Sequence, residues 1–304
     1  MSRALTKRQP CGTISDLAAR TSALAWLVVI FACGVDGRPG SERSTPPSAG
    51  RVDVGGYELA YECHGSGSPT IVTEAGYDSS GIATWADLID ELAATSRSCA
   101  YDRAGTGASD DRPGAGRLTS GDQAGELHAL LEGADIEPPY VLVAHSYGGF
   151  VSRLFADAYA PETAGLVLIE SSHENEIDAY EAFYGDDPEG DGIDGGDVID
   201  IQKTEAELRR ARNFGDLPLV AIRAERYEDV LAEDLWRRTQ ADLATLSTDG
   251  VAVVARGSGH FVMEENPGVV VAAIEAVVTA ARSDEPLPKC PALFADLRAE
   301  CPRR

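Results

Sequence analysis

One serine of this chain stands in a setting that can make its hydroxyl reactive. Ser146 lies in the segment YVLVAHSYGGF (residues 140–150), between an apolar run and two glycines. A strand that turns sharply into a helix presents such a hydroxyl at the strand end, and the turn crowds the positions two residues before and after it. Those positions hold the small residues Ala144, where glycine is more usual, and Gly148. The segment therefore predicts a nucleophile, and the alternative is a serine that only caps a helix.

Strand-like and helix-like stretches alternate around this serine. Continuous apolar runs are typical of strands buried on both faces, and a helical period marks the stretches between them. Strands are predicted over 57–63, 70–73, 97–101, 140–144, 165–170, 218–222 and 251–255, and helices over 85–94, 122–131, 150–159, 231–246 and 268–281. Repeated strand–helix units predict an α/β fold, a parallel sheet with helices on both faces.

The charge of the chain excludes some partners. Its formal net charge is −24 over 304 residues. Such a balance argues against nucleic acid as a partner and against binding by charge to an anionic membrane. It does not identify a substrate.

The N-terminus has the pattern of a secretory signal. Basic residues precede the apolar run SALAWLVVIFAC (residues 22–33), which is short for a membrane span. We interpret residues 1–32 as a signal peptide. Ile30–Cys33 resembles a bacterial lipobox, so Cys33 is the lipidation candidate; simple cleavage and an uncleaved anchor are the alternatives. The protein is then extracytoplasmic, secreted or lipid-anchored to the membrane of a bacterium.

The rest of the chain divides into a linker, a folded domain and a tail. Residues 33–50 are rich in Gly, Pro and Ser and lack hydrophobic periodicity, which predicts a flexible linker. The folded domain is predicted over 51–283, and residues 284–304 form a C-terminal tail.

Six cysteines fit an exported protein. Cys11 lies in the signal, and Cys33 is the lipidation candidate. The four others allow three pairings, among which the sequence cannot choose: Cys63, Cys99, Cys290 and Cys301.

An acidic stretch interrupts the strand–helix rhythm. We interpret residues 173–216 as a small lid inserted in the domain. Its carboxylates are spaced by four, three and three residues, unlike the alternate positions of an EF-hand, so a solvated acidic loop is favoured over a calcium site. They are Asp187, Asp191, Asp194 and Asp197.

From Tyr57 to about Ala281 the chain resembles serine-nucleophile members of the α/β-hydrolase fold family. YDRAGTGAS (101–109) resembles the family's D-R-x-G-x-G-x-S turn, and TEAGY (73–77) stands where the family has its oxyanion loop. GSGHFVMEENP (257–267) resembles the late loop that carries the catalytic histidine. The resemblance implies a mostly parallel sheet of eight strands with helices on both faces and a small lid.

The resemblance also implies a base. His260 follows the last predicted strand and Ser146 in the order that this fold uses, so it would take the serine proton. His145 is predicted to be structural, with its side chain on the opposite face of the sheet, whereas His173 lies where it could touch substrate. The remaining histidines are placed away from the site: His64 and His128.

Two backbone groups would stabilise the developing oxyanion, the N–H groups of Tyr77 and Tyr147. Their positions are given by the resemblance, because a backbone donor does not depend on side-chain type. Asp102 and Arg103 are predicted to form a structural turn rather than to react.

A serine nucleophile and a histidine base need a third residue, an acid that orients the histidine, and this member of the catalytic triad is the least conventional. Most of the family places an aspartate after the strand at 218–222, where the usual register gives Tyr227. Some members take the acid from the preceding strand, which ends here in Glu170. A carboxylate at the end of a buried strand is otherwise costly. We therefore predict Glu170 as the acid, with Glu225 and Asp229 as alternatives.

The resemblance further implies one disulfide. In this fold the antiparallel second strand lies beside the fourth, which would join Cys63 to Cys99. Cys290 and Cys301 are then left to pair with each other.

These features together favour an exported serine hydrolase that cleaves small carboxylic esters through an acyl-enzyme, with no cofactor and no metal. Hydrolysis of amides or lactones is an alternative on the same fold. A catalytically silent protein that binds a ligand or partner in the same pocket is another.

Overall fold

The computed structural model describes residues 48–77, 79–114, 116–175, 192–194, 196–211, 213–227 and 230–302. Side chains are described for all of these except 192–194 and 230–233. The predicted signal peptide, the lipidation candidate Cys33 and most of the predicted linker lie outside these residues.

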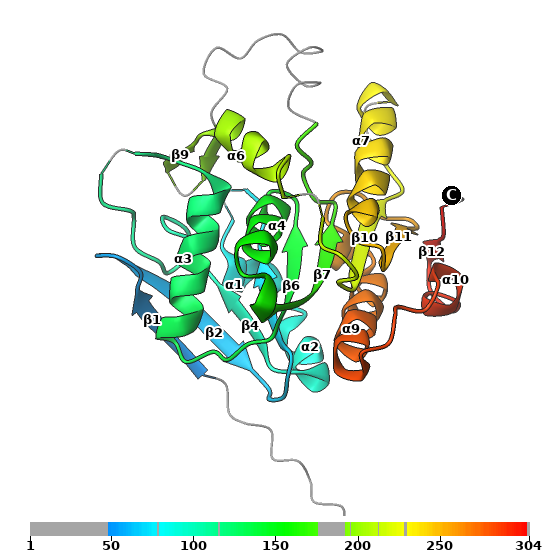
Figure 1. Cartoon of the computed structure of the whole chain (residues 1–304), viewed down its shortest axis with the longest axis horizontal. Coiled ribbons are helices and arrows are strands. Elements are labelled where there is room, and N and C mark those ends of the chain that lie inside the picture. Colours follow the sequence, from blue (N-terminus) through cyan, green and yellow to red (C-terminus); the bar gives the residue numbers. More distant parts are fainter. Residues whose placement is uncertain are drawn as a thin grey trace, which may run out of the picture. The chain divides into compact units, whose positions relative to one another are not determined.

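A mixed sheet of nine strands forms the centre of the domain, in the order β1-β2-β4-β3-β6-β7-β10-β11-β12 (Figure 1). The strands β1–β2, β2–β4 and β11–β12 pair antiparallel, and the other neighbours pair parallel. Their bounds are Ser48–Asp53 (β1), Glu58–His64 (β2), Thr70–Glu74 (β3), Ser98–Tyr101 (β4), Tyr140–His145 (β6), Thr163–Ile169 (β7), Leu219–Ala224 (β10), Gly250–Ala255 (β11) and Ala299–Glu300 (β12). The predicted α/β-hydrolase fold, with its mostly parallel sheet, is confirmed.

Two boundaries of the prediction are wrong. β1 begins at Ser48, within the predicted linker, and the predicted tail contributes β12, which pairs with β11 and raises the sheet from eight strands to nine. Both are edge strands, and β1 is largely exposed, so neither needed the apolar pattern by which a strand is recognised.

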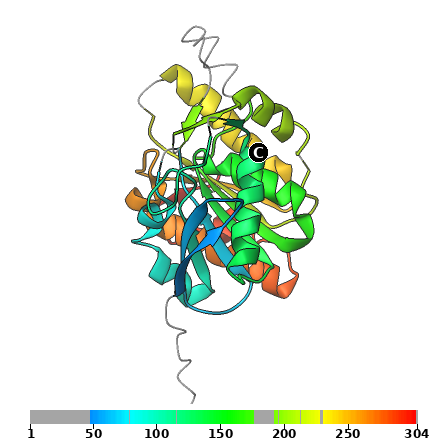
Figure 2. The ribbon, with the colours of Figure 1, turned by 90° about the vertical axis from the view of Figure 1, so that its left-hand side faces the viewer.

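Helices cover both faces of the sheet, as Figure 2 shows from the β1 edge. α3 and α4 pack together on one face of the sheet. α2 and α9 contact each other in the hydrophobic core on the opposite face. The helices are α1 (Gly81–Trp85), α2 (Ile89–Thr95), α3 (Ser120–Gly133), α4 (Gly148–Ala158), α6 (Ile201–Leu208), α7 (Val230–Leu243), α8 (Val262–Glu265), α9 (Pro267–Ser283) and α10 (Cys290–Leu293). The single helix predicted over 85–94 is two helices, because the turn between them lets Trp85, Leu88 and Ile89 enter the same core.

The described part of the lid contains β8, β9 and helix α6, and its two strands form a small second sheet with β5, in the order β5-β9-β8. β5 (Arg117–Leu118) and β9 (Asp197–Ile199) are parallel, and β8 (Gly192–Asp194) pairs antiparallel with β9. Of the acidic residues considered for calcium, Asp187 and Asp191 lie outside the described residues, as does the side chain of Asp194. The Asp197 carboxylate accepts a hydrogen bond from Arg112 Nε at 3.0 Å, so this carboxylate is used to hold the lid.

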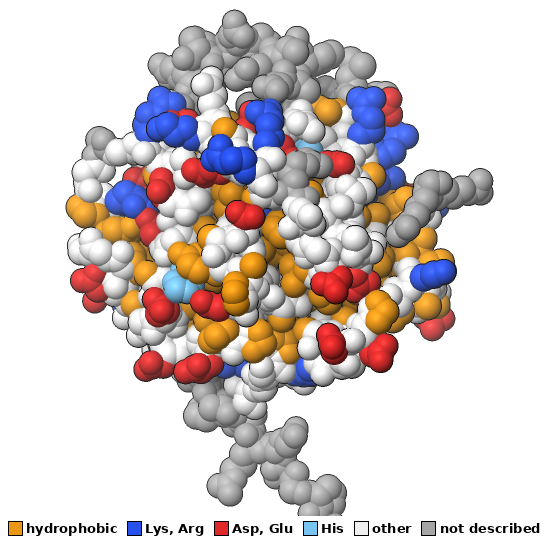
Figure 3. Space-filling view, in the orientation of Figure 1, with side chains coloured by type: hydrophobic (Ala, Val, Ile, Leu, Met, Phe, Trp, Pro, Cys, Tyr) orange, Lys and Arg blue, Asp and Glu red, His pale blue; other side chains and the backbone are white. Residues whose placement is uncertain are grey.

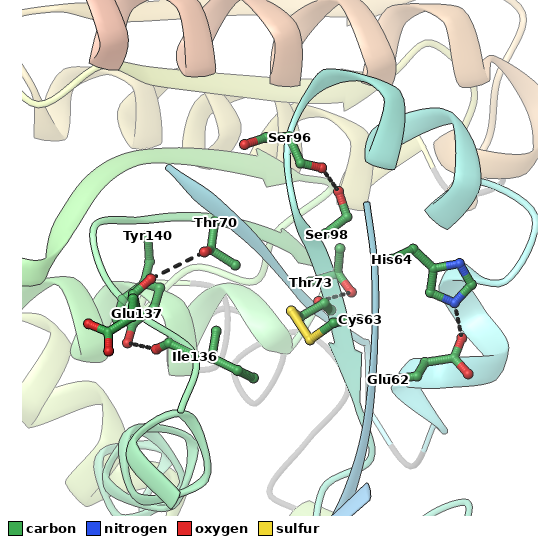
Figure 4. The surroundings of a disulfide bond; sticks show 11 residues. Glu62, Cys63, His64, Thr70, Thr73, Ser96, Ser98, Ile136, Glu137 and Tyr140 are labelled. Carbon is green, nitrogen blue, oxygen red and sulfur yellow. Dashed lines mark hydrogen bonds and ion pairs between the residues drawn. A yellow bond between two sulfur atoms is a disulfide. The ribbon is translucent and has the colours of Figure 1, made fainter. Parts of the chain in front are cut away.

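Both predicted disulfides are confirmed. Cys63 on β2 and Cys99 on β4 are direct partners in the antiparallel register and are bonded, and Figure 4 shows the bond beside Thr73 of β3. Cys290 on α10 is bonded to Cys301, next to β12. The second bond therefore ties α10 to the residue that follows β12.

Within the described ranges, no helix has both the length and the apolar character needed to cross a bilayer.

Candidate active site

The predicted turn at Ser146 is present. β6 ends at His145 and α4 begins at Gly148. Ser146, between them, has φ 52°, a backbone angle that residues other than glycine rarely adopt. A Cβ on Gly148 would lie 2.5 Å from the carbonyl oxygen of Ala75, and one on Gly149 would lie 1.5 Å from Ser171 Oγ. The two glycines therefore let the neighbouring strand ends approach the serine closely. Ala144 is fully buried in β6 and fits where a glycine was the more usual choice.

Glu170 lies beside Ser146 at the end of the adjacent strand. β6 and β7 are parallel, with His145 opposite Ile169, so the serine and the glutamate are the next residues on neighbouring strands. Glu170 is fully buried and also has a positive φ, 47°. The backbone is thus in an uncommon conformation at both positions, which is a frequent feature of functional sites.

The loop after β11 brings His260 to Glu170. Nδ1 of the histidine lies 3.4 Å from Oε2 of the glutamate, and the histidine side chain is 40% exposed. Because Nδ1 is the nitrogen next to the carboxylate, Nε2 is the one available for a substrate or a serine proton. The structure therefore joins two of the three predicted triad members directly and places the third at the neighbouring strand end.

Three further donors surround the Glu170 carboxylate. Oε1 accepts hydrogen bonds from the Ala224 N–H at 2.5 Å and from the Tyr227 hydroxyl at 2.6 Å, and Oε2 accepts one from Trp236 Nε1 at 2.9 Å. Burial, and then the charge of Glu170, raise the pKa of Tyr227 above its usual value, so its hydroxyl remains a donor. Every oxygen of this buried carboxylate therefore has hydrogen-bond donors, which offsets the cost of burying it.

Sequence reasoning placed Tyr227 where an acid is usual but did not assign it as a partner of Glu170, and it missed Trp236. The contact between Glu170 and Tyr227 depends on β7 and β10 being neighbours in the sheet. The contact between Glu170 and Trp236 depends on α7 lying near the end of β7. Neither is visible in local sequence.

Of the two alternative acids, the structure describes Glu225, and its carboxylate has other partners. Glu225 accepts a hydrogen bond from the Gly257 N–H at 2.7 Å and pairs with Arg256 at 2.6 Å. These two contacts, the first of them dominant, lower the pKa of Glu225. Its carboxylate therefore binds the start of the loop that carries His260, at Arg256 and Gly257, and not the histidine itself. Asp229 lies outside the described residues.

His145 is structural, as predicted, but it lies against the predicted base. Its Nε2 is 3.0 Å from the carbonyl oxygen of His260, and the two rings have centroids 4.6 Å apart. Burial, and secondarily the neighbouring His260, lower the pKa of His145 to about 3. A neutral His145 therefore donates to the backbone of the loop that carries His260.

The prediction that His173 could touch substrate is wrong. Its side chain is fully buried, with Nε2 2.9 Å from Asp242 Oδ2 of α7 and with Nδ1 accepting from the Asn175 N–H. The adjacent Glu174 forms a buried ion pair with Arg153 at 2.8 Å. This ion pair and the hydrogen bonds of His173 make burial of the polar loop possible, and the loop anchors the segment after Glu170. His64 and His128 lie elsewhere, beside Asp90 and stacked on Tyr159.

The predicted oxyanion donors belong to two segments that meet at Ser146. Tyr147 is the N-cap of α4, and the first N–H groups of a helix have no acceptor within it. Tyr77 lies in the loop between β3 and α1, and a Cβ on Gly76 in that loop would lie 3.4 Å from Ser146 Cβ. The rings of Tyr77 and Tyr147 contact each other with centroids 4.4 Å apart. Both backbone segments are therefore next to the serine.

The surface around the site combines an aromatic ring with cations. Phe261, directly after the predicted base, is 51% exposed and contacts the rings of His145 and His260. On the face in Figure 3, Lys and Arg side chains gather at the end that α6 and α7 occupy in Figure 1. α7 also carries Trp236, which binds Glu170, so this end of the molecule includes an element that adjoins the site.

Comparison with known proteins agrees with the fold. A family model described as alpha/beta hydrolase fold matches residues 63–252. The uncharacterized protein YqjL of Bacillus subtilis is 30% identical over 223 residues, which is 71% of this chain and 86% of that protein.

Solved structures with a similar fold include two enzymes of different chemistry. An esterase from Thermogutta terrifontis has a TM-score of 0.57 at 18% identity, covering 78% of this chain and 100% of its own. The haloalkane dehalogenase DatA from Agrobacterium tumefaciens has a TM-score of 0.57 at 17% identity, covering 77% and 97%. At these identities the likeness shows the fold and does not choose between the two reactions.

Proposed function

The chain belongs to the alpha/beta hydrolase fold family and is a hydrolase of that superfamily, and we propose that within it the protein is a serine hydrolase of carboxylic esters. Ser146 is the nucleophile, His260 the base and Glu170 the acid. The reaction passes through an acyl-enzyme and needs only these side chains, two backbone donors and water.

One observation carries this proposal. Ser146, in a turn with positive φ, and Glu170, bound to His260, directly follow the last paired residues of two neighbouring parallel strands. Nothing in a purely structural role explains a buried carboxylate that binds a 40% exposed histidine beside a strained serine. A serine nucleophile also sets the protein apart from dehalogenases and epoxide hydrolases, which use an aspartate.

The steps follow from the roles. His260 Nε2 accepts the Ser146 proton while Oγ attacks the acyl carbon, and Glu170 stabilises the imidazolium that results. The N–H groups of Tyr77 and Tyr147 donate to the oxyanion. Collapse of the tetrahedral species expels the alcohol, which takes the proton from His260. A water molecule, deprotonated by His260, then attacks the acyl-enzyme, and the acid is released with Ser146 reprotonated.

The test is a substrate panel with a matched variant. p-Nitrophenyl esters of increasing chain length, a p-nitroanilide and a lactone are compared on the wild-type protein and on Ser146→Ala. We expect ester turnover that Ser146→Ala abolishes. Turnover of only the anilide or the lactone would move the proposal to another bond type. No turnover of any of them would favour the silent, ligand-binding alternative.

We also propose that the protein acts outside the cytoplasm, held to the membrane by a lipid on Cys33. The basic start, the short apolar run and the lipobox-like Ile30–Cys33 support this. The two disulfides in the described domain are compatible with an oxidising compartment.

A further inference from the structure

A buried arginine contacts the backbone of the predicted oxyanion loop. Arg103, whose side chain is 3% exposed, donates from Nη1 to the carbonyl oxygen of Ala75 at 3.0 Å and from Nη2 to that of Gly76 at 2.5 Å. These two carbonyls immediately precede Tyr77. One planar guanidinium therefore fixes two successive peptide groups, which a single ammonium group could not do with the same geometry.

The bond to Gly76 has a direct consequence for the Tyr77 N–H. The carbonyl of Gly76 and the N–H of Tyr77 belong to the same planar peptide group, which is trans, so the C=O and N–H bonds point in opposite directions. Binding the carbonyl oxygen on the buried side directs the N–H away from Arg103. The cation also polarises the peptide, and chains of hydrogen bonds of this kind strengthen the donor at their far end.

The same guanidinium also reaches the second donor segment. Arg103 Cζ lies 5.4 Å from the centroid of the Tyr147 ring, within the range of a cation–π contact. The hydroxyl of Tyr147 is in turn bound to Gln123 at 2.6 Å and to Ser120 at 2.9 Å. Arg103 thus lies between the loop of Tyr77 and the start of α4 and contacts both.

A buried cation needs a counter-charge, which Glu74 supplies. Glu74 is 1% exposed, and its Oε1 lies 2.5 Å from Arg103 Nη1. Its other oxygen accepts from the Tyr101 hydroxyl, whose pKa is raised by burial and then by Glu74, so that it stays protonated. The pair is therefore compensated without using the bonds from Arg103 to the two carbonyls.

We propose that Arg103 is a positioning residue for the oxyanion site: by binding the carbonyls of Ala75 and Gly76 it aims the Tyr77 N–H at the developing oxyanion. The inference rests on the proposed esterase function. The variant Arg103→Lys keeps the positive charge that faces Glu74, but its ammonium group cannot bind both carbonyls with the same geometry. Tyr101→Phe is the matched control, because it perturbs the same buried cluster and leaves those carbonyl contacts in place.

The assay measures kcat and KM for a p-nitrophenyl ester and the inhibition constant of phenylboronic acid, which forms a tetrahedral adduct with an active serine. The amplitude of the p-nitrophenol burst counts active sites, so that misfolded protein does not enter kcat. Removing one oxyanion donor typically lowers kcat about 10²- to 10³-fold, and misaiming it should lower kcat about 10- to 100-fold. We expect this loss in Arg103→Lys, with KM within about threefold and a parallel rise in the boronate constant.

A second variant guards against loss of the fold. Arg103→Met combined with Glu74→Gln removes both charges together and leaves no unpaired buried carboxylate. It should be folded and show the same loss in kcat. Tyr101→Phe should retain kcat within about threefold. An active wild type with unchanged kcat in Arg103→Lys, or an equal loss in Tyr101→Phe, would overturn the inference, whereas an inactive wild type would refute the proposed function instead.

Discussion

Replacing Glu170 by glutamine tests the unusual position of the acid. The carboxylate accepts from four donors, the Ala224 N–H, Tyr227, Trp236 and His260. A glutamine keeps the shape of the side chain, but its –NH₂ must face either the first two donors or the last two. In either orientation the –NH₂ group, a donor, faces two other donors and cannot accept their hydrogen bonds. The glutamine also carries no charge to stabilise the imidazolium of His260.

The size of the effect follows from these contacts. A buried donor left without an acceptor costs about 1–3 kcal/mol, so the free energy of unfolding should fall by roughly that amount. The catalytic loss is larger, because the acid of such a triad sets the tautomer of the base, and its amide variant lowers kcat about 10⁴-fold in a serine protease. For Glu170→Gln we expect kcat to fall about 10³- to 10⁴-fold, with little change in KM.

The assay compares p-nitrophenyl ester turnover of Glu170→Gln with two controls, and circular dichroism verifies folding. Glu225→Gln changes a partly exposed carboxylate that binds Arg256 and Gly257, and kcat should remain within about twofold. Asp229→Asn is expected to remain active as well. Near wild-type turnover in Glu170→Gln, together with an inactive Glu225→Gln or Asp229→Asn, would refute the assignment.

Three further predictions concern stability and location. Removing the Cys63–Cys99 bond as a double alanine variant should lower the free energy of unfolding by about 2–4 kcal/mol in urea denaturation; no change would contradict a stabilising bond. Although burial alone would raise it, the charge of Arg153 lowers the pKa of Glu174 to about 2, so this pair stabilises the fold above pH 4.5 and the gain is lost as pH falls towards 2. The thermal midpoint should therefore fall in acid less steeply in Glu174→Gln, and identical pH profiles would argue against the pair. Cys33→Ser should release the protein from the membrane fraction and abolish labelling by a fatty-acid probe; unlabelled wild type would refute lipidation.

The proposed nucleophile and the proposed acid could be recognised in the sequence because each departs from a local pattern. Ser146 has small residues where a sharp turn requires them, and Glu170 is a charge at the end of an otherwise apolar strand. Each anomaly lies within a short segment, so the sequence alone indicates it. In the structure, each directly follows one of two neighbouring parallel strands, whose last paired residues are His145 and Ile169.

The supporting contacts were not predictable, because they join residues far apart in the chain. Trp236 lies 66 residues from Glu170, and His173 lies 69 residues from Asp242. A polar stretch such as that around His173 is typical of an exposed loop, and it is buried here because α4 brings Arg153 to Glu174 and α7 brings Asp242 to His173. β1 was missed for a different reason, since an exposed edge strand carries no apolar pattern.

Labelling with a fluorophosphonate probe tests the central claim, that Ser146 is an activated nucleophile, most directly. Peptide mapping by mass spectrometry of the labelled protein should recover one adduct, on Ser146. The adduct should be absent from Ser146→Ala and formed much more slowly in His260→Ala. A wild-type protein that remains unlabelled, or one labelled equally well after Ser146→Ala, would contradict the account.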